Sequence, residues 1–185
     1  MGWGGIPFVT VWKQKRIEKP RVMVLCDVSG SVAPMSQFLL MFLYALNEAL
    51  SDIRSFAFAG SLIEVSEILE KEPVEQAIAK IMETIGFGSS NFGNSFADFE
   101  DGWMQFVTNK TTIIVLGDAR GNKTDPRTDI GAALHQFHDD FAGRKPRAVL
   151  LLTDGADTRG VYNTLDEARR FRAFACPVHA FAYGN

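Results

Sequence analysis

Three short apolar runs, each ending beside an aspartate, most constrain the fold of this chain. Uninterrupted apolar runs of this length are typical of parallel strands that are covered on both faces. Because parallel strands share one direction, their carboxyl ends meet at one edge of the sheet. The sequence therefore predicts three aspartates on the same rim. The runs cover residues 22–26, 111–116 and 148–153, and the aspartates are Asp27, Asp118 and Asp154.

Segments with helical periodicity separate these runs, and this alternation predicts an α/β fold with right-handed crossovers. A tight hairpin at Gly60-Ser61 would join strands at residues 55–59 and 62–65 and place one antiparallel strand at a sheet edge. We therefore predict a doubly wound, mostly parallel six-stranded sheet with one antiparallel edge strand and helices on both faces, a Rossmann-like architecture. The other predicted elements are helices at residues 35–50, 74–85, 96–107, 128–141 and 165–174 and a last strand at 177–183.

The helix predicted at residues 35–50 carries an apolar stripe, which we expect to face the core. Phenylalanine is abundant in the chain, and its spacing indicates packing rather than a binding function. The stripe consists of Phe38, Leu39, Phe42, Leu46 and Leu50.

Length and composition indicate one globular α/β domain preceded by a short arm. The chain has 185 residues, of which 46% are hydrophobic and 22% charged. Residues 1–20 form the predicted basic arm, and residues 21–185 the single domain. The net charge of −3 gives no reason to expect nucleic acid as a partner. No apolar run approaches the ~20 residues that a membrane span needs.

The two cysteines, Cys26 and Cys176, lie far apart in the sequence without a second cysteine or a histidine at zinc-ligand spacing. We expect both to be buried free thiols in a reducing compartment. The N-terminus has no basic segment followed by an apolar stretch, as a signal peptide would have. The chain as given is therefore expected to be cytoplasmic.

The residues Asp27-Val28-Ser29-Gly30-Ser31 follow the first strand and suit a divalent cation. One carboxylate and two hydroxyls at alternate positions make a small cup lined with oxygen. Hard cations such as Mg²⁺ take oxygen ligands, and Mg²⁺ usually keeps some of its waters. The sequence thus predicts a site for Mg²⁺ or Mn²⁺ at the end of this strand.

This pattern resembles the metal-ion-dependent adhesion site (MIDAS) of von Willebrand factor type A (VWA) domains, whose signature is Asp-x-Ser-x-Ser. The resemblance implies a further hydroxyl in a later loop and a second aspartate after the fourth strand. Ser90 and Asp118 occupy those places, so the implied metal residues are Asp27, Ser29, Ser31, Ser90 and Asp118. A metal ion held mostly by neutral hydroxyls would attract an acidic side chain of a partner protein. The implied function is a protein-interaction module and not an enzyme.

A closer resemblance covers residues 3–126 and points to the CoxE-like VWA family. It rests on Gly4-Gly5-Ile6-Pro7-Phe8, on the strand and metal motif from Val24 to Ser31, on residues 38–43 and on Leu116-Gly117-Asp118-Ala119-Arg120. Members of this family are bacterial accessory proteins, typically encoded beside MoxR-type AAA+ ATPases. The resemblance implies an adaptor role in the assembly or activation of metalloenzymes.

Residues 128–185 instead resemble the C-terminal half of another VWA domain, with a possible join near residues 125–128. Thr128 and Asp154 repeat the spacing of Ser90 and Asp118 and form an alternative closing pair for the metal site. Topology favours Ser90 and Asp118, because the preceding elements already fill the expected order. The closing helix that VWA domains usually carry is absent before Asn185, so we expect an exposed hydrophobic sheet face.

Two rival functions use the same residues. A metal-dependent phosphoester hydrolase could employ the oxygen-lined cup, and a purely structural VWA domain would leave it empty. No histidine is arranged with Ser29 as a general base, which disfavours a nucleophilic enzyme. His135 and His138, three residues apart on a predicted helix, lack an evident third ligand and are interpreted as a solvated or partly buried pair.

Overall fold

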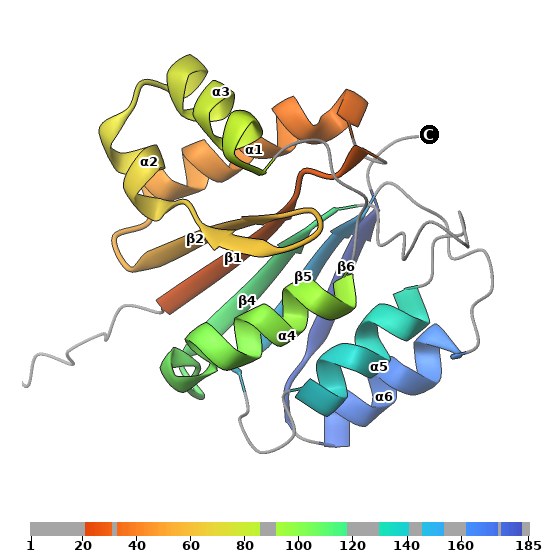
Figure 1. The fold of residues 1–185 in the computed structure, drawn as a ribbon. Helices are drawn as coiled ribbons and strands as arrows, with labels where there is room; N and C mark the ends of the chain where they lie inside the picture. Colours follow the sequence, from red (N-terminus) through yellow and green to blue (C-terminus); the bar gives the residue numbers. More distant parts are fainter. Residues whose placement is uncertain are drawn as a thin grey trace, which may run out of the picture.

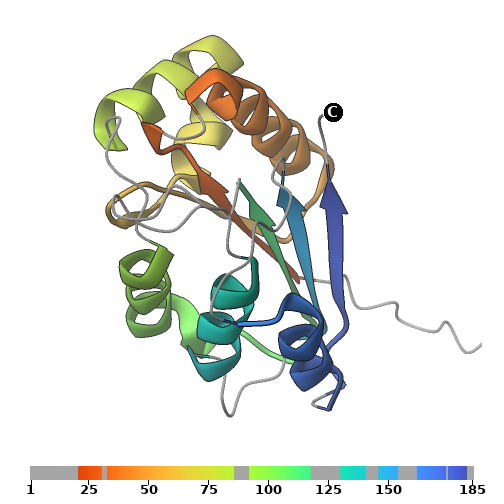
Figure 2. The ribbon, with the colours of Figure 1, turned by 90° about the vertical axis from the view of Figure 1, so that its right-hand side faces the viewer.

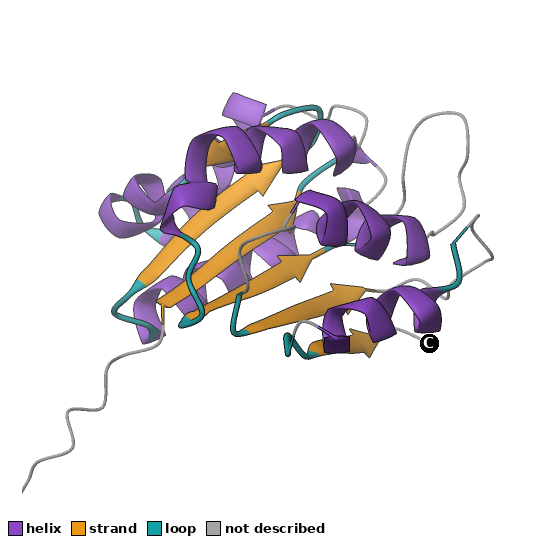
Figure 3. Ribbon diagram, turned by 90° about the horizontal axis from the view of Figure 1, so that it is seen from below, coloured by secondary structure: helices purple, strands orange, loops and turns teal. Residues whose placement is uncertain are grey.

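The protein is represented by a computed structural model, which describes residues 21–30, 33–85, 92–117, 130–140, 146–153, 162–173 and 175–182. These residues form one sheet with helices on both of its faces (Figures 1 and 3). The strands are β1 (Arg21–Asp27), β2 (Ile53–Phe58), β3 (Leu62–Glu64), β4 (Thr111–Leu116), β5 (Ala148–Thr153) and β6 (Val178–Ala182). The helices are α1 (Ala33–Ala49), α2 (Ser66–Lys71), α3 (Val74–Ile85), α4 (Phe92–Trp103), α5 (Ile130–Asp140) and α6 (Thr164–Ala173), with a 3-10 turn η2 (Met104–Phe106).

The sheet has six strands in the order β3-β2-β1-β4-β5-β6. All neighbouring pairs are parallel except β2 and β3, which form the antiparallel pair at one edge. The predicted fold class is confirmed, including the antiparallel edge strand. In this order β1 lies between β2 and β4, so its carboxyl end is flanked by two other strand ends.

Alternation of side chains along the central strands produces two hydrophobic cores, one on each face of the sheet. Val22, Val24 and Cys26 of β1 face the layer made by α1, α2 and α3. Met23 and Leu25 face the layer made by α4, α5 and α6. Figure 2 shows the two helix layers on opposite sides of the strands. Strands buried on both faces explain why the parallel runs are apolar without interruption.

A polar cluster fixes α4 beneath the β2–β3 hairpin. Arg54 donates two hydrogen bonds to the Glu64 carboxylate, from Nε at 3.1 Å and from Nη2 at 3.2 Å. Trp103 Nε1 donates to the same carboxylate at 3.1 Å, and the Leu62 amide donates to Asp98 Oδ2 at 3.0 Å. The bonds of Trp103 and Asp98 join α4 to the hairpin, and those of Arg54 hold Glu64 in place, so the position of α4 is set relative to the sheet.

The sequence did not predict α2, and it made the hairpin loop too short. The connection between β2 and β3 has three residues, Ala59 to Ser61, and the Ala59 amide donates to the Ser61 carbonyl at 3.3 Å. The six residues of α2 follow almost directly, in a stretch for which no element was predicted. Ser66 Oγ accepts a hydrogen bond from the Ser55 amide at 2.9 Å, which ties the start of α2 to β2.

The predicted apolar stripe of the first helix was wrong for its two phenylalanines. Phe38 is 56% exposed and Phe42 is 36% exposed. The buried face instead follows the helical spacing of Ser36, Leu39, Leu40 and Leu43. Almost every position near residue 40 is apolar, so the sequence pattern alone did not identify the buried side.

Across the described ranges, no helix combines the length and the apolar character needed to cross a membrane.

The two sides of α1 predict very different costs of truncation. Leu40→Ala should lower the free energy of unfolding by about 2–5 kcal/mol, because it leaves a cavity in the core. Phe38→Ala should change it by no more than about 0.5 kcal/mol, because the ring is mostly in solvent. Urea unfolding followed by circular dichroism measures both values. Equal losses for the two variants would contradict the orientation of α1.

Candidate functional site

Asp27 lies at the carboxyl end of β1 and is completely buried. Its Oδ1 accepts a hydrogen bond from the Ser29 amide at 2.8 Å, a side-chain-to-backbone turn that aspartate commonly forms. The Val28 amide donates to the Phe58 carbonyl at 2.9 Å, which continues the pairing of β1 with β2 for one more residue. These two bonds hold Asp27 and Ser29, the latter also fully buried, in one rigid turn.

The end of β4 packs directly against the Asp27 side chain. The registers pair Cys26 with Leu116, so Gly117 lies beside Asp27. A Cβ atom built on Gly117 would be 2.8 Å from Asp27 Cβ and 3.4 Å from Asp27 Oδ2. Glycine at this position therefore allows the backbone of β4 to approach the carboxylate. The Gly117 amide donates to the Leu152 carbonyl at 3.0 Å, which ties this approach to β5.

The first turn of α4 lies at the same end of the sheet. Phe96 packs against Phe58, the partner of Asp27 in β2, with their ring centroids 6.4 Å apart. Ser95, in that first turn, is fully buried, and its Oγ has no hydrogen-bond partner within the described part of the chain. A buried hydroxyl without a partner is costly, so Ser95 suits a polar occupant of this region. The sequence analysis did not identify Ser95; its small polar side chain inside an otherwise apolar helix face was the available signal.

Of the predicted metal residues, Asp27 and Ser29 are described and lie together. Ser31, Ser90, Asp118, Thr128 and Asp154 lie outside the described residues. No group of three or more histidine, cysteine, aspartate or glutamate side chains that could hold a metal occurs among the residues described. The predicted ligand set does not require such a group, because three of its members are serine hydroxyls. A buried carboxylate beside a serine is the donor chemistry that a hard cation prefers.

Both cysteines are buried free thiols, as predicted. Burial, and secondarily the negative charge of Asp27, raises the pKa of the Cys26 thiol well above its ordinary value. Burial also raises the pKa of Cys176, to about 11. The thiol next to Asp27 is therefore protonated at neutral pH and does not act as a thiolate ligand or nucleophile.

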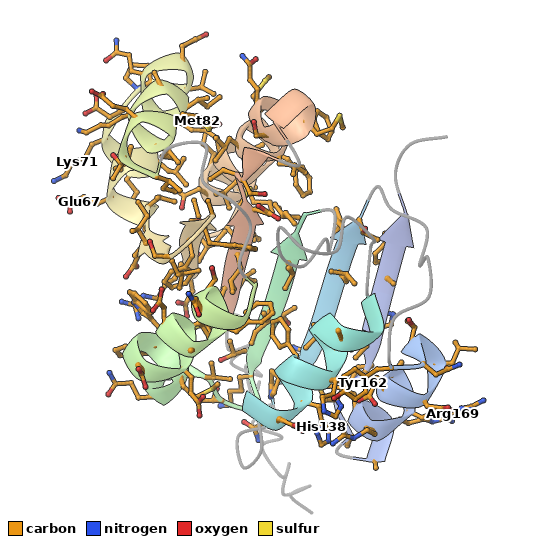
Figure 4. The ribbon with its side chains drawn as sticks, turned by 45° about the vertical axis from the view of Figure 1, so that its right-hand side comes forward. Glu67, Lys71, Met82, His138, Tyr162 and Arg169 are labelled. Carbon is orange, nitrogen blue, oxygen red and sulfur yellow. The ribbon has the colours of Figure 1, made fainter. Side chains whose placement is uncertain are left out.

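The His135–His138 pair belongs to a polar cluster that joins α5 to α6. Arg170 Nη1 donates to Glu167 Oε2 at 2.7 Å and Arg170 Nη2 to Asp139 Oδ1 at 3.1 Å. His135 Nδ1 lies 3.2 Å from the same Glu167 oxygen, and its ring stacks on Tyr162 with centroids 3.8 Å apart. Figure 4 labels His138 and Tyr162 on this side of the molecule. The hydrogen bond with His138, together with nearby His135 and Arg170, holds the pKa of Asp139 below its usual range. The partly buried pair that the sequence predicted thus has a structural role.

The close packing of Gly117 on Asp27 generates a stability prediction. Gly117→Ala should lower the free energy of unfolding by about 1–3 kcal/mol, because the new methyl group overlaps a Cβ atom that is fixed to the backbone. Gly102→Ala is the matched control, because a Cβ atom at Gly102 in α4 meets nothing within 4 Å. It should raise stability by about 0.5–1 kcal/mol, as alanine favours a helix. Similar effects for both variants, measured by urea unfolding, would disprove the close approach of β4 to Asp27.

The raised thiol pKa values predict slow thiol chemistry and a loss of stability at alkaline pH. A disulfide reagent should modify neither cysteine of the folded protein at about pH 8.5, the ordinary pKa of a thiol, and both after unfolding. Since the folded pKa of Cys176 is about 11, the folded state keeps a proton that the unfolded chain loses. Stability should therefore fall as the pH rises from about 8.5 towards 11, and the urea midpoint measures this. Rapid labelling of the folded protein would contradict the burial of both thiols.

Comparison with solved structures finds proteins with the same fold. The D319A mutant of the PilB minor pilin from Streptococcus sanguinis matches with a TM-score of 0.56 and 8% identity, over 91% of this chain and 58% of that one. The RO (RSR) protein of Deinococcus radiodurans matches with a TM-score of 0.52 and 15% identity, over 90% and 32%. A von Willebrand factor type A protein from Catenulispora acidiphila matches with a TM-score of 0.51 and 14% identity, over 89% and 39%. The chain thus spans between about a third and three fifths of these proteins, and identities this low show the fold alone.

No curated protein matches the chain. A family model does match, the one described as VWA domain containing CoxE-like protein, over residues 1–128. That match includes β1 to β4 and covers more than half of the 185 residues. The solved VWA structure matches in fold over 89% of the chain. The chain therefore belongs to the CoxE-like family of VWA domains.

Proposed function

We propose that this chain is a metal-ion-dependent protein-interaction module. One observation carries the proposal: the Asp27 carboxylate is completely buried at the end of a central strand, in a turn with Ser29 and against the backbone of Gly117. A buried carboxylate is costly unless charge or hydrogen bonds compensate it. A cation at this rim would add to the compensation that the hydrogen bond from the Ser29 amide provides.

The proposed ligand set combines Asp27 with hydroxyls. Ser29, Ser31 and Ser90 would contact Mg²⁺ or Mn²⁺ through neutral oxygens, and Asp27 and Asp118 would hold it mainly through waters. When bound, such a metal ion supplies positive charge that its own ligands neutralise only in part. The residues of this chain would then leave one place for an acidic side chain from a partner protein, which gains a charge-assisted interaction.

The strand order supports Asp118 over Asp154 as the second carboxylate. Asp118 follows Gly117, which already touches Asp27, and β4 is the direct neighbour of β1. Asp154 follows β5, which is one strand further from β1. Neighbouring strands lie about 4.8 Å apart, so the end of β5 is about 10 Å from the end of β1. Thr128 and Asp154 remain the alternative closing pair.

Family membership supports the further proposal of an accessory role. CoxE-like proteins are typically encoded beside MoxR-type AAA+ ATPases, and we propose such an ATPase as the partner in metalloenzyme maturation. We propose a binding module without catalysis, in keeping with the accessory role inferred from the family. Two buried free thiols suit a reducing cytoplasm as the place of action.

The Asp27→Asn variant tests the site while keeping an oxygen that can accept the hydrogen bond from the Ser29 amide. Calorimetric titration should show Mg²⁺ or Mn²⁺ bound about 10- to 100-fold more weakly, because the charge of the carboxylate is lost. Asp52→Asn is the matched control, since Asp52 pairs with Arg21 on the surface at the opposite end of β1. That variant should bind metal as the wild type does.

Three outcomes of the titration would decide between the alternatives. Unchanged metal affinity in folded Asp27→Asn would overturn the proposal, and no metal binding by the wild type would favour a structural domain. Loss of binding in Asp154→Asn but not in Asp118→Asn would assign the site to the alternative pair.

A separate activity assay tests the rival enzyme function. Metal-dependent hydrolysis of a phosphoester by the purified wild type, abolished in Asp118→Asn, would establish it.

A further inference from the structure

The two edges of the sheet differ in how well they are protected. The β3 edge has three residues, and its Glu64 is held by Arg54 and Trp103. The β6 edge has five residues, and none of them carries a formal charge. Short strands and charged side chains are the usual means of preventing an edge from pairing with another chain. The β3 edge uses both of these devices and the β6 edge uses neither.

The backbone of β6 has a defined set of groups that point away from the sheet. The Val149 amide donates to the Pro177 carbonyl at 3.0 Å, and Leu150 and Leu152 pair with His179 and Phe181. In a parallel ladder alternate residues bond to the same neighbour. His179 and Phe181 therefore bond to β5, and Val178, Ala180 and Ala182 direct their amides and carbonyls outward. No strand of the described part of the chain pairs with this outer side, and β6 is the outermost strand in Figure 2.

The side chains of β6 are exposed as well. His179 and Phe181 lie on the face of the sheet that carries α1, and Phe181 is 54% exposed. Ala180 is also exposed, on the opposite face, where Val178 packs near α6. An uncharged edge strand with exposed backbone groups and an exposed aromatic ring can pair with a strand of another chain.

We propose that β6 pairs antiparallel with β6 of a second copy of this chain, with the two Ala180 residues directly opposite each other. In this register the outward backbone groups of Ala180 bond to those of Ala180 in the second copy, and Val178 bonds to Ala182. The two sheets then form one continuous sheet of twice six strands. His179 of one copy lies opposite Phe181 of the other in a pair without hydrogen bonds, where side chains approach most closely.

Charge complementarity favours a second copy of this chain over an unrelated strand. A two-fold axis perpendicular to the sheet runs the α6 helices of the two copies antiparallel on the same face. Glu167 and Arg170 are held in the cluster with α5, but Asp166 in the acidic first turn of α6 and Arg172 in its basic last turn are exposed. Each acidic turn would therefore lie towards the basic turn of the other helix. Leu165, which is 67% exposed in the first turn, would gain apolar cover in the same contact.

Two arginines of α6 bear on this charge argument. Arg172 is exposed and takes part in no ion pair within the described ranges, whereas Arg169, which projects from α6 away from the sheet (Figure 4), pairs with Asp166 at 2.7 Å. The antiparallel arrangement brings a carboxylate of the other copy, Asp166, towards Arg172, whereas parallel α6 helices would set like charges side by side. The proposed contact uses no metal residue and holds whether or not the metal site exists.

Light scattering coupled to size exclusion tests the proposal on the full chain. The wild type should show a species of twice 20.5 kDa that dissociates on dilution and persists in a chelator. Phe181→Lys should weaken this dimer by about tenfold or more, because a charge on each edge strand opposes pairing. Phe38→Lys is the matched control, as Phe38 is equally exposed on α1, and it should leave the dimer unchanged. A wild type that is monomeric at every concentration, or a dimer lost only in Phe38→Lys, would overturn the proposal.

A cysteine placed on the two-fold axis tests the register independently of any effect on folding. Directly opposite residues of a hydrogen-bonded antiparallel pair have Cα atoms about 5.5 Å apart, which suits a disulfide. Ala180→Cys should therefore form a covalent dimer under mild oxidation. The wild type, whose two thiols are buried, and Phe38→Cys should not. Failure of Ala180→Cys to cross-link, or equal cross-linking of Phe38→Cys, would disprove this register.

Discussion

Asp27 is buried where the ends of three strands meet, and much of the local structure follows from accommodating its carboxylate. The Ser29 amide must turn back to Oδ1, so the chain leaves β1 in a tight turn before α1 begins. The neighbouring strand must present glycine, because any side chain on residue 117 would overlap Asp27. A protein tolerates a carboxylate in its interior when hydrogen bonds or an opposite charge compensate it. Burial and, secondarily, the charge of the same carboxylate raise the pKa of the neighbouring Cys26 thiol.

The parallel strands were predictable because they are buried on both faces. Residues 111–116 and 148–153 were identified to the residue, since continuous apolar runs of that length leave little choice. The orientation of α1 was not predictable for the same reason: residues 38–43 are all apolar, so the pattern fits more than one buried face. Packing on β1 selected Leu39, Leu40 and Leu43. The short helix α2 escaped prediction because a six-residue element has too few turns to show a period.

The sequence indicated which residues could form the candidate site, but the structure describes the geometry of only two of them. Asp27 and Ser29 lie together as the motif requires, whereas the remaining predicted ligands fall outside the described residues. Gly131, three residues after Thr128 of the alternative closing pair, has a packing explanation. A Cβ atom on Gly131 would collide with the Tyr162 carbonyl oxygen, so glycine at this position lets the chain at the start of α6 pack against the first turn of α5. Sequence likeness to a metal-site loop therefore does not by itself assign Thr128 to the metal.

The strand order separates the two surfaces that we propose to be functional. The proposed metal rim belongs to β1 and β4 at the centre of the sheet, and the proposed pairing edge belongs to β6, two strands beyond β4. Because strands lie about 4.8 Å apart, extending the sheet at β6 adds material about 10 Å or more from the end of β4. Pairing along that edge proceeds sideways through backbone groups, whereas a partner's acidic side chain would approach the strand ends along the strand direction. Because the two-fold axis reverses the strands, the two proposed metal rims of a pair joined through β6 would lie at opposite ends of the continuous sheet. A partner that binds both rims must therefore extend from one end of the joined sheet to the other. A partner that binds a single rim should bind the monomer and the dimer alike.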